Sequence, residues 1–281
     1  MTKPILIDRP NVSLAWAEAF SLINIAPKHR LMPLILSFEG FANGDVIEDA
    51  AIRAALDAAL SASEMQKVQT VANTIFPQAL WRVAKGDRQT LYASYLENLP
   101  EYVAMEPQKN GRGLYFGRLI AYDINPKDGE RLPHIPDGAI PENGNQLEFL
   151  IQRCKKGVRA SAFQASLFDP ARDHLSTPYL GFPCLQHVTF VPDFHDGTVG
   201  LNAFYATQQL FEKGYGNYLG LARLGLFFAS QTGLRFTRVT CFAGVEKIDS
   251  DSKPKLGTTL DTVAQACSEA LEVAGAVGAL P

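Results

Sequence analysis

The chain has 281 residues, of which 47% are hydrophobic and 20% are charged. This length is enough to bury a sizeable core, and the composition is that of an ordinary globular protein. The formal net charge of −3 gives no electrostatic reason to expect binding to bulk nucleic acid or to a membrane surface.

The hydropathy pattern does not indicate a membrane-spanning or a secreted protein. No apolar stretch reaches the roughly 20 residues of a membrane span without a charge. Lys3, Asp8 and Arg9 bracket an apolar run that is too short for a signal peptide. The four cysteines are too widely spaced to suggest a disulfide framework. The pattern therefore predicts a reduced, cytoplasmic protein.

The first part of the chain predicts helices around a buried strand. Asn11 can cap a helix that reaches Ile23, because apolar residues recur there at helical spacing. Residues 34–38 are expected to form a buried strand. Residues 48–62 and 87–96 are expected to be helical, with a mixture of helix and loop over residues 64–84.

The later part of the chain predicts most of the sheet. Residues 123–145 are rich in proline and glycine, which predicts a long loop or insertion such as a lid. Strands are expected at 159–168, 185–191, 198–205 and 236–242, and helices at 217–232 and 258–279. Since there is no repeat and no sign of a second core, residues 1–281 are expected to form one α+β domain.

Cys184 is the candidate nucleophile. It follows Pro183 at the head of a predicted strand, where its sulfur can be held rigidly against a cleft. A free thiol is only a few per cent thiolate at neutral pH unless its surroundings lower its pKa. A single cysteine at such a position is more often a small buried hydrophobic residue, so the surrounding motifs decide how Cys184 is interpreted.

These motifs occur in a fixed order along residues 70 to 245. They are Leu80-Trp81 with Lys85-Gly86-Asp87, Leu114 to Arg118, Asn145 to Lys156, Ala165 to Pro170, Pro183-Cys184, Asp196-Gly197, Asn217, Ala229 and Thr232-Gly233-Leu234. In order and spacing the set resembles the thymidylate synthase and deoxycytidylate hydroxymethylase superfamily, in which a Pro-Cys motif carries the nucleophile.

The resemblance implies a thymidylate synthase-like fold, with a mixed sheet and flanking helices, and a homodimer. It also implies methylation or hydroxymethylation at C5 of a small pyrimidine substrate, with 5,10-methylenetetrahydrofolate as the one-carbon donor. The thiolate of Cys184 would add to C6, while Gln78 and Tyr115 would form the polar wall of the catalytic cleft. Asn217 would contact the ring, and its amide can donate to O4 and accept from N3–H, which favours uracil.

The chain departs from the family at the phosphate site. Ala206 stands where the family has an arginine, and Thr207 and Gln209 stand at the neighbouring hydroxyl and aspartate positions. Ser161 and Ala162 replace the two arginines that the family's partner subunit contributes. Because each arginine makes a strong charge-assisted contact, their absence argues against deoxyuridylate as the substrate.

Three arginines, Arg30, Arg159 and Arg223, are candidates for holding whatever replaces the phosphate, together with Thr207. Arg159 lies close to the replaced arginine pair, and Arg223 is the sole charge in an otherwise apolar predicted helix. Gln78 stands where the family has a glutamate, and an amide cannot accept a proton at neutral pH. The sequence therefore leaves two alternatives, a divergent one-carbon transferase and a non-catalytic relative that binds a nucleotide or a protein partner.

Two other interpretations are disfavoured. Gly214-x-Gly216-x-x-x-Gly220 resembles a dinucleotide-binding turn, but residues 232–243 lack the required acidic residue. A tight loop with Asn217 as a helix cap is expected instead. A cysteine hydrolase would need a histidine beside Cys184, whereas strand alternation puts His187 on the opposite face. With no Cys-x-x-Cys pair, no metal site is expected.

Overall fold

The computed structural model describes residues 3–132, 144–156, 159–174, 176, 182–248 and 253–278. Its centre is a mixed sheet in the spatial order β1-β3-β9-β8-β7-β6, with β2 also paired to β9. The strand pairs β1–β3 and β8–β9 are parallel, and the others are antiparallel. The strands are β1 (Ile5–Arg9), β2 (Arg30–Leu31), β3 (Leu34–Phe38), β6 (Gln164–Ser166), β7 (Leu185–Asp193), β8 (Thr198–Gln209) and β9 (Arg235–Lys247).

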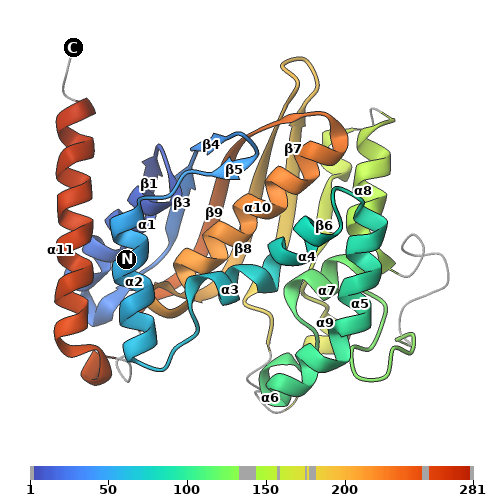
Figure 1. The fold of residues 1–281 in the computed structure, drawn as a ribbon, viewed down its shortest axis with the longest axis horizontal. Coiled ribbons are helices and arrows are strands. Elements are labelled where there is room, and N and C mark those ends of the chain that lie inside the picture. Colours follow the sequence, from blue (N-terminus) through green and yellow to red (C-terminus); the bar gives the residue numbers. More distant parts are fainter. Residues whose placement is uncertain are drawn as a thin grey trace.

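Helices pack on one face of this sheet (Figure 1). The central one is α10 (Tyr215–Thr232), which lies between the sheet and α3 (Val68–Ile75). The other helices are α1 (Val12–Ile25), α2 (Ala50–Ala62), α4 (Gln78–Val83), α5 (Arg88–Met105), α6 (Pro107–Asn110), α7 (Tyr115–Ile120), α8 (Gln146–Cys154), α9 (Pro170–Asp173) and α11 (Lys253–Gly278). The chain also has a small hairpin, β4 (Phe41–Ala42) with β5 (Asp45–Val46). Its single turns are η1 (Pro27–His29), η3 (Ala160–Ala162) and η4 (Leu210–Gly214).

The two faces of the sheet differ in burial. On the helix side, the inward residues of the long strands are buried, as the period of two along a strand requires. We call the opposite side the open face. A row of residues in register crosses it from strand to strand, and beside it runs a polar row that includes Thr189, Asn202 and Thr240. The first row is Leu6, Ile35, Phe242, Phe204 and His187.

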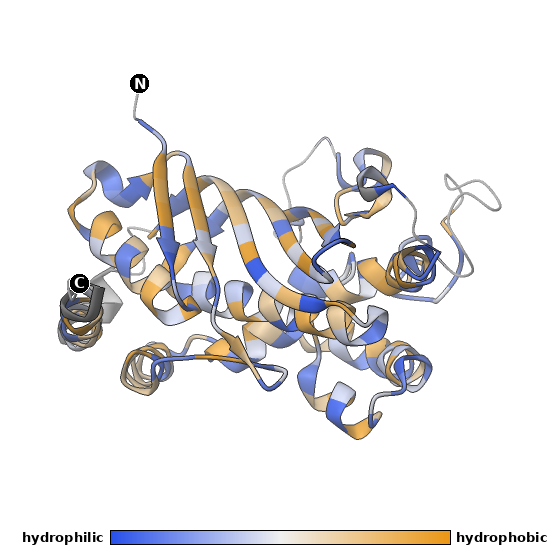
Figure 2. Ribbon diagram, turned by 90° about the horizontal axis from the view of Figure 1, so that it is seen from above, coloured by the Kyte–Doolittle hydropathy of each residue, from blue (hydrophilic) through white to orange (hydrophobic). Residues whose placement is uncertain are grey.

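The two ends of the apolar part of this row are exposed, and Ile35 and Phe242 between them are half-buried. Leu6 is 71% exposed and Phe204 is 40% exposed, and the rings of Phe204 and Phe242 are stacked with centroids 5.3 Å apart. Figure 2 shows the strands along one side of the molecule and most of the helices on the other. In the described part of the chain, no further layer therefore covers this largely apolar row.

Several helix boundaries follow from the local chemistry that the sequence predicts. The side chain of Asn11 accepts a hydrogen bond from the Leu14 N–H (2.9 Å) and begins α1. Asp49 and Asp87 cap α2 and α5 in the same way. Gly233 has a φ of 76° and ends α10 in the left-handed conformation that glycine adopts without strain. The predicted strand at 34–38 is confirmed as β3.

Other boundaries differ from the prediction. Asn217 is not a helix cap, because α10 is already under way at Tyr215, after the π turn η4. The strand expected over 159–168 is reduced to β6, since residues 160–162 turn as η3. Strands β8 and β9 extend past the predicted ends, and α5 continues to Met105 through Pro100. In each case tertiary packing extends or shortens an element that the local pattern identified.

A buried ion pair joins α7 to α9. Arg118 and Asp173 are 2% and 0% exposed, and the guanidinium donates to both carboxylate oxygens at 2.6 and 2.8 Å. Arg118 also donates to the carbonyl oxygen of Leu167 (2.6 Å), and Asp173 accepts from the Asp169 N–H (2.9 Å). Because the hydrogen-bonding groups of both charges are used, this pair holds the segment around residues 112–123 against the sheet edge.

Candidate functional site

Cys184 lies immediately before β7, where that strand meets β8 and α7. Its carbonyl oxygen accepts the Ala206 N–H (3.2 Å), and the hydroxyl of Tyr115 accepts the Leu185 N–H (3.4 Å). The thiol is half-buried and packs against the hydrophobic core. The pairing of Leu185 with Tyr205 fixes the start of β7 against β8. Three elements therefore position Cys184 at one edge of the sheet.

Burial and one cation act in opposite directions on this thiol. Burial raises the pKa of Cys184, while the ammonium group of Lys247 lowers that pKa by a smaller amount. Burial also raises the pKa of Tyr115, and the nearby Cys184 adds to that rise. In the absence of a ligand the thiol is thus held mainly in its neutral form.

The ends of β8 and β9 bring further polar side chains to the same edge. These strands are parallel, so their carboxyl ends coincide, and the antiparallel β7 begins there. Thr207 pairs with Val245, and Gln209 pairs with Lys247. Asn217 follows in the first turn of α10, where it is 5% exposed. The structure therefore places Cys184, Tyr115, Thr207, Gln209 and Asn217 around one edge.

Beneath this edge lies a group that we call the interior polar cluster: Tyr205 and Gln208 of β8, Tyr218 of α10 and Glu246 of β9. Each of the four is at most 2% exposed. Within the described chain, the Tyr205 hydroxyl, both amide atoms of Gln208 and Glu246 Oε1 are buried without a protein hydrogen bond. The remaining oxygen, Glu246 Oε2, accepts from the Tyr218 hydroxyl at 3.3 Å. Such groups in protein interiors are usually bridged by ordered water.

The cluster extends from Glu246 toward Cys184. Burial raises the pKa of Glu246 well above its usual value. The pKa of Tyr205 is also raised, chiefly by burial and then by the charges of Tyr115, Cys241, Cys184 and Glu246. The Tyr205 phenol therefore lies within electrostatic reach of both the thiol and the buried carboxyl group.

Sequence reasoning missed this cluster, although a signal was present. The inward positions of β9 run as Val239, Cys241 and Ala243, and Glu246 then breaks both the period of two and the apolar pattern. Gln208 breaks the pattern of β8 in the same way and pairs with Glu246. Buried carboxylates are rare, so an acidic residue at the end of an apolar strand can be noticed from the sequence pattern alone.

Gln78 and Arg223 lie apart from the Cys184 edge. Both line a small pocket whose other walls include Trp81, Phe227 and Ser230. From Asn217 to Ser230 the axis of α10 advances roughly 20 Å, so this pocket lies toward the opposite end of the helix. Arg223 Nη2 donates to Gln69 (3.0 Å), whereas Nε and Nη1 are buried without a partner in the described part of the chain.

Arg159 is exposed and lies beside η3, away from the Cys184 edge. The adjoining Phe163 packs on Phe194 with ring centroids 6.3 Å apart, and Phe194 directly follows the far end of β7. The structure therefore brings neither Arg159 nor Arg223 to Cys184. The described residues of the predicted loop 123–145 begin with a turn in which Ile124 bridges Arg131, and residues 133–143 lie outside the described residues.

His187 lies on the open face, paired with Phe204, and its Nε2 makes a 2.5 Å hydrogen bond with Gln164. Burial lowers its pKa. Among the described residues, no histidine forms the hydrogen bond to Cys184 that a cysteine hydrolase requires.

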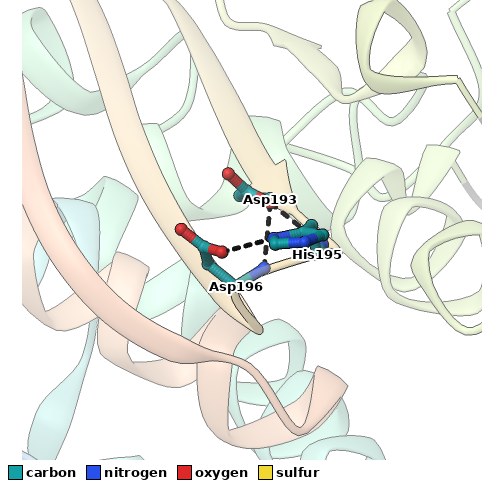
Figure 3. A group of neighbouring side chains, drawn as sticks. All are labelled: Asp193, His195 and Asp196. Carbon is teal, nitrogen blue, oxygen red and sulfur yellow. Dashed lines mark hydrogen bonds and ion pairs between the residues drawn. The ribbon is translucent and has the colours of Figure 1, made fainter.

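Asp193, His195 and Asp196 gather at the turn between β7 and β8 (Figure 3). Their ligand atoms lie within 4.8 Å of one another, and all three residues are exposed. Asp193 Oδ1 accepts the backbone N–H groups of His195 (2.9 Å) and Asp196 (3.1 Å), and His195 Nδ1 lies 2.6 Å from Asp196 Oδ1. These contacts are those of a side-chain-stabilised turn, which accounts for the arrangement.

The glycines that resemble a dinucleotide-binding turn serve helix packing instead. A Cβ at Gly216 would lie 2.6 Å from the Cβ of Val71, and one at Gly220 would lie 2.8 Å from the Ala72 carbonyl oxygen. Both glycines lie inside α10, at its contact with α3. Their role is to let the two helix backbones approach closely.

Comparison with known proteins does not assign the chain to a family, because no family model and no curated protein matches it. None of the described helices has the length and apolar character needed to cross a membrane.

Proposed function

We propose that the chain is a divergent relative of the thymidylate synthase and deoxycytidylate hydroxymethylase superfamily that modifies C5 of a uracil-type pyrimidine. The observation that carries the proposal is the edge at which Cys184, Tyr115 and Asn217 meet. It offers a half-buried thiol, a buried phenol and a buried amide. A pyrimidine ring needs these groups: a nucleophile for C6 and hydrogen-bonding groups for its polar edge.

The chemistry assigned to the chain's own residues is reversible addition. The sulfur of Cys184 forms a bond to C6, the ring electrons move toward C5 and O4, and C5 takes up a proton from water. Loss of the original C5 proton and cleavage of the S–C6 bond then return the pyrimidine and the thiolate. Asn217 would donate to O4 and accept from N3–H, which stabilises the charge that builds up there.

The proposed one-carbon donor, 5,10-methylenetetrahydrofolate, rests on the sequence resemblance alone. The described side chains around Cys184 do not identify a surface that fits a reduced folate, so we derive no step through it. The proposed substrate is not deoxyuridylate itself, because Ala206 offers no guanidinium to a phosphate.

The proposal is tested by exchange of the C5 proton. The protein is incubated in deuterated water with uracil and cytosine bases, nucleosides and nucleotides, and loss of the C5 proton is followed by NMR. We expect exchange for a uracil compound, its loss in Cys184→Ala, and a shift toward the cytosine analogue in Asn217→Asp. Absence of exchange throughout, including with tetrahydrofolate present, would refute the transferase.

A binding protein without catalysis is the second candidate, and one observation favours it. Burial raises the pKa of Cys184, which leaves less thiolate at neutral pH than a free cysteine would have. The same exchange experiment separates the candidates: a binding protein would shift the resonances of a pyrimidine ligand without exchanging its C5 proton.

We also propose that the chain forms a homodimer through the open face. Leu6, Ile35, Phe242 and Phe204 form a continuous apolar row across four strands, and a second copy rotated by half a turn would present the same row. Apolar side chains in register on an uncovered sheet are typical of an interface that another layer covers.

A further inference from the structure

Arg223 is a cation that the proposed chemistry at Cys184 does not use. It lies in the middle of α10, and its Nη2 donates to Gln69 of α3 at 3.0 Å. The Nε and Nη1 atoms are buried and have no hydrogen-bond partner in the described part of the chain. Buried donors that stay unpaired are costly, above all on a charged group. The guanidinium therefore has hydrogen bonds left to donate.

The charges near Arg223 leave its own charge largely uncompensated. Burial lowers its pKa, and the charges of Glu48 and Asp45 act in the opposite direction. Glu48 already pairs with Arg53 at 2.5 Å, and Asp45 Oδ1 accepts a backbone N–H at 2.9 Å. An arginine side chain keeps its proton under all ordinary conditions. The side chain thus stays a cation, and an anion could still bind to it.

Arg223 lines the small pocket between α4, α10 and the β4–β5 hairpin. The volume of this pocket is about 80 Å³. That is about half of the roughly 150 Å³ of an engineered cavity that binds benzene, so the pocket suits a small ligand group and not a whole nucleotide. Three of its lining residues, Gly44, Asp45 and Ser230, are exposed, so the pocket opens to solvent.

The other walls of the pocket are mainly aromatic. The rings of Trp81 and Phe227 pack edge to face with centroids 5.0 Å apart, and the ring of Phe227 lies 5.1 Å from that of Phe76. Gln78 adds an amide group, which can donate a hydrogen bond. Apolar walls with a few polar groups are usual in sites for small molecules. The pocket therefore fits a ligand that has one apolar part and one anionic end.

The charges of the lining residues favour a monoanion over a dianion. Arg223 is the sole cation among the described residues that line the pocket, and Asp45 adds a carboxylate to the same lining. A phosphate dianion would have one guanidinium for its two charges, and Asp45 would repel both of them. A carboxylate carries a single charge, and its two oxygens match the planar donors of an arginine.

We propose that this pocket binds a small organic monocarboxylate. Its carboxylate accepts hydrogen bonds from the Arg223 donors that have no protein partner, and its apolar part lies against Trp81 and Phe227. Arg223 and Gln78 are then ligand-binding residues of a site separate from the Cys184 edge. The inference goes beyond the proposed function and does not depend on it.

The first experiment titrates the native chain with butyrate and benzoate, and with the uncharged butyramide and benzamide. Binding is measured by saturation transfer in NMR and by the fluorescence of Trp81, since the other tryptophan, Trp16, is 0% exposed in the core. We expect a carboxylate to bind at least about tenfold more tightly than its amide, because the amide loses the charge-assisted hydrogen bonds. Inorganic phosphate should bind more weakly than the carboxylate.

Three results of this titration would overturn the proposal. They are the absence of binding by either carboxylate, equal binding of acid and amide, and tighter binding of phosphate than of the carboxylates.

The second experiment repeats the titration with Arg223→Gln. This variant should bind the carboxylate about 10- to 100-fold more weakly, since the charged donors are lost. The matched control is Arg235→Gln, because Arg235 is exposed at the start of β9 and should leave the affinity unchanged. A thermal unfolding curve checks that each variant is folded. An unchanged affinity in Arg223→Gln would contradict the assignment.

Asp45→Asn tests the site without altering a buried residue, since Asp45 is exposed. The asparagine keeps an oxygen for the backbone N–H and removes the repelling charge. The carboxylate should therefore bind about two- to fivefold more tightly, and unchanged or weaker binding would count against the site. Cys184→Ala should bind the carboxylate as the native chain does. Loss of binding in that variant would place the ligand at the Cys184 edge and refute a separate site, whereas the C5 exchange experiment tests the transferase independently.

Discussion

Arg118 and Glu246 are both buried ionisable residues, but they are stabilised differently. Arg118 donates to both oxygens of Asp173 and to a carbonyl oxygen, so its charge is compensated where it lies. Glu246 has one weak hydrogen bond and no cation among the described residues. The first arrangement is that of a structural ion pair, whereas the second holds a carboxyl group mainly in its protonated form.

The raised pKa of Glu246 predicts a loss of stability as the pH rises. The folded chain keeps this proton above pH 4.5, where the unfolded chain gives it up, so folding becomes less favourable until the pH reaches the folded-state pKa. Glu246→Gln removes this decline. We therefore expect the variant to gain up to about 1.4 kcal/mol over the native chain for each pH unit in that window.

Urea unfolding at a series of pH values measures this difference. The exposed Glu97→Gln should follow the native curve. A constant difference between Glu246→Gln and the native chain across the window would contradict a carboxyl group buried in its neutral form.

The close packing of α10 against α3 depends on two glycines of α10. Gly216 and Gly220 let the two helix backbones approach, and almost every residue of α10 up to Ala229 is buried. The helix is thus apolar nearly all round because it lies between the sheet and α3. Arg223 is half-buried at this contact and donates to Gln69 of α3.

Gly216→Ala tests this contact. Its Cβ would meet Val71 and the Val68 carbonyl oxygen at 2.6 and 2.8 Å, so the helices would have to separate. We expect the free energy of unfolding to fall by about 1–3 kcal/mol, more than the gain in helix propensity. The control is Gly275→Ala in α11, where an added Cβ meets nothing within 4 Å. That change should stabilise by about 0.5 kcal/mol, and equal effects in the two variants would contradict the packing argument.

The arrangement of the whole molecule leaves the open face uncovered by the described residues. Helices occupy the other face, so the apolar row from Leu6 to Phe204 has water as its neighbour in a single chain. The neighbouring polar row, with Thr189, Asn202 and Thr240, would limit a second copy to one register.

Phe204→Glu should therefore convert a dimer to a monomer. The carboxylate would be desolvated beside Phe242 in the apolar row, which opposes association. Sedimentation velocity of the native chain and the variant measures the effect. Ile25→Glu is the control, since Ile25 is 83% exposed at the end of α1 and lies off the sheet. A monomeric native chain, or a variant that stays dimeric, would refute this interface.

Local chemistry made part of the fold predictable. Asn11 and Gly233 mark helix ends because their side chain or backbone freedom acts within a few residues. The apolar run of β3 and the alternation in β7 and β8 predict strands for the same reason. The order of the strands was not, since β1 and β3 pair with each other and with β9 across most of the chain length.

The sequence predicted only part of the candidate site. Cys184, Tyr115 and Asn217 share one edge, whereas Gln78 and Arg223 occupy a separate pocket and Arg159 is exposed elsewhere. The order of motifs along the chain assigns a role to each residue separately. It does not predict which end of α10 a given residue lies beside.

By itself, the sequence determined the elements, their caps and the presence of an unusual cysteine, because these depend on neighbours along the chain. Only the tertiary structure decided the strand order, the uncovered apolar row and the burial of Glu246 beneath the Cys184 edge. The physical reason is that burial and pairing arise between residues distant in sequence. The same carboxyl group would be an ordinary acid on the surface, and it is a neutral one in the interior because β8, β9 and α10 exclude water around it.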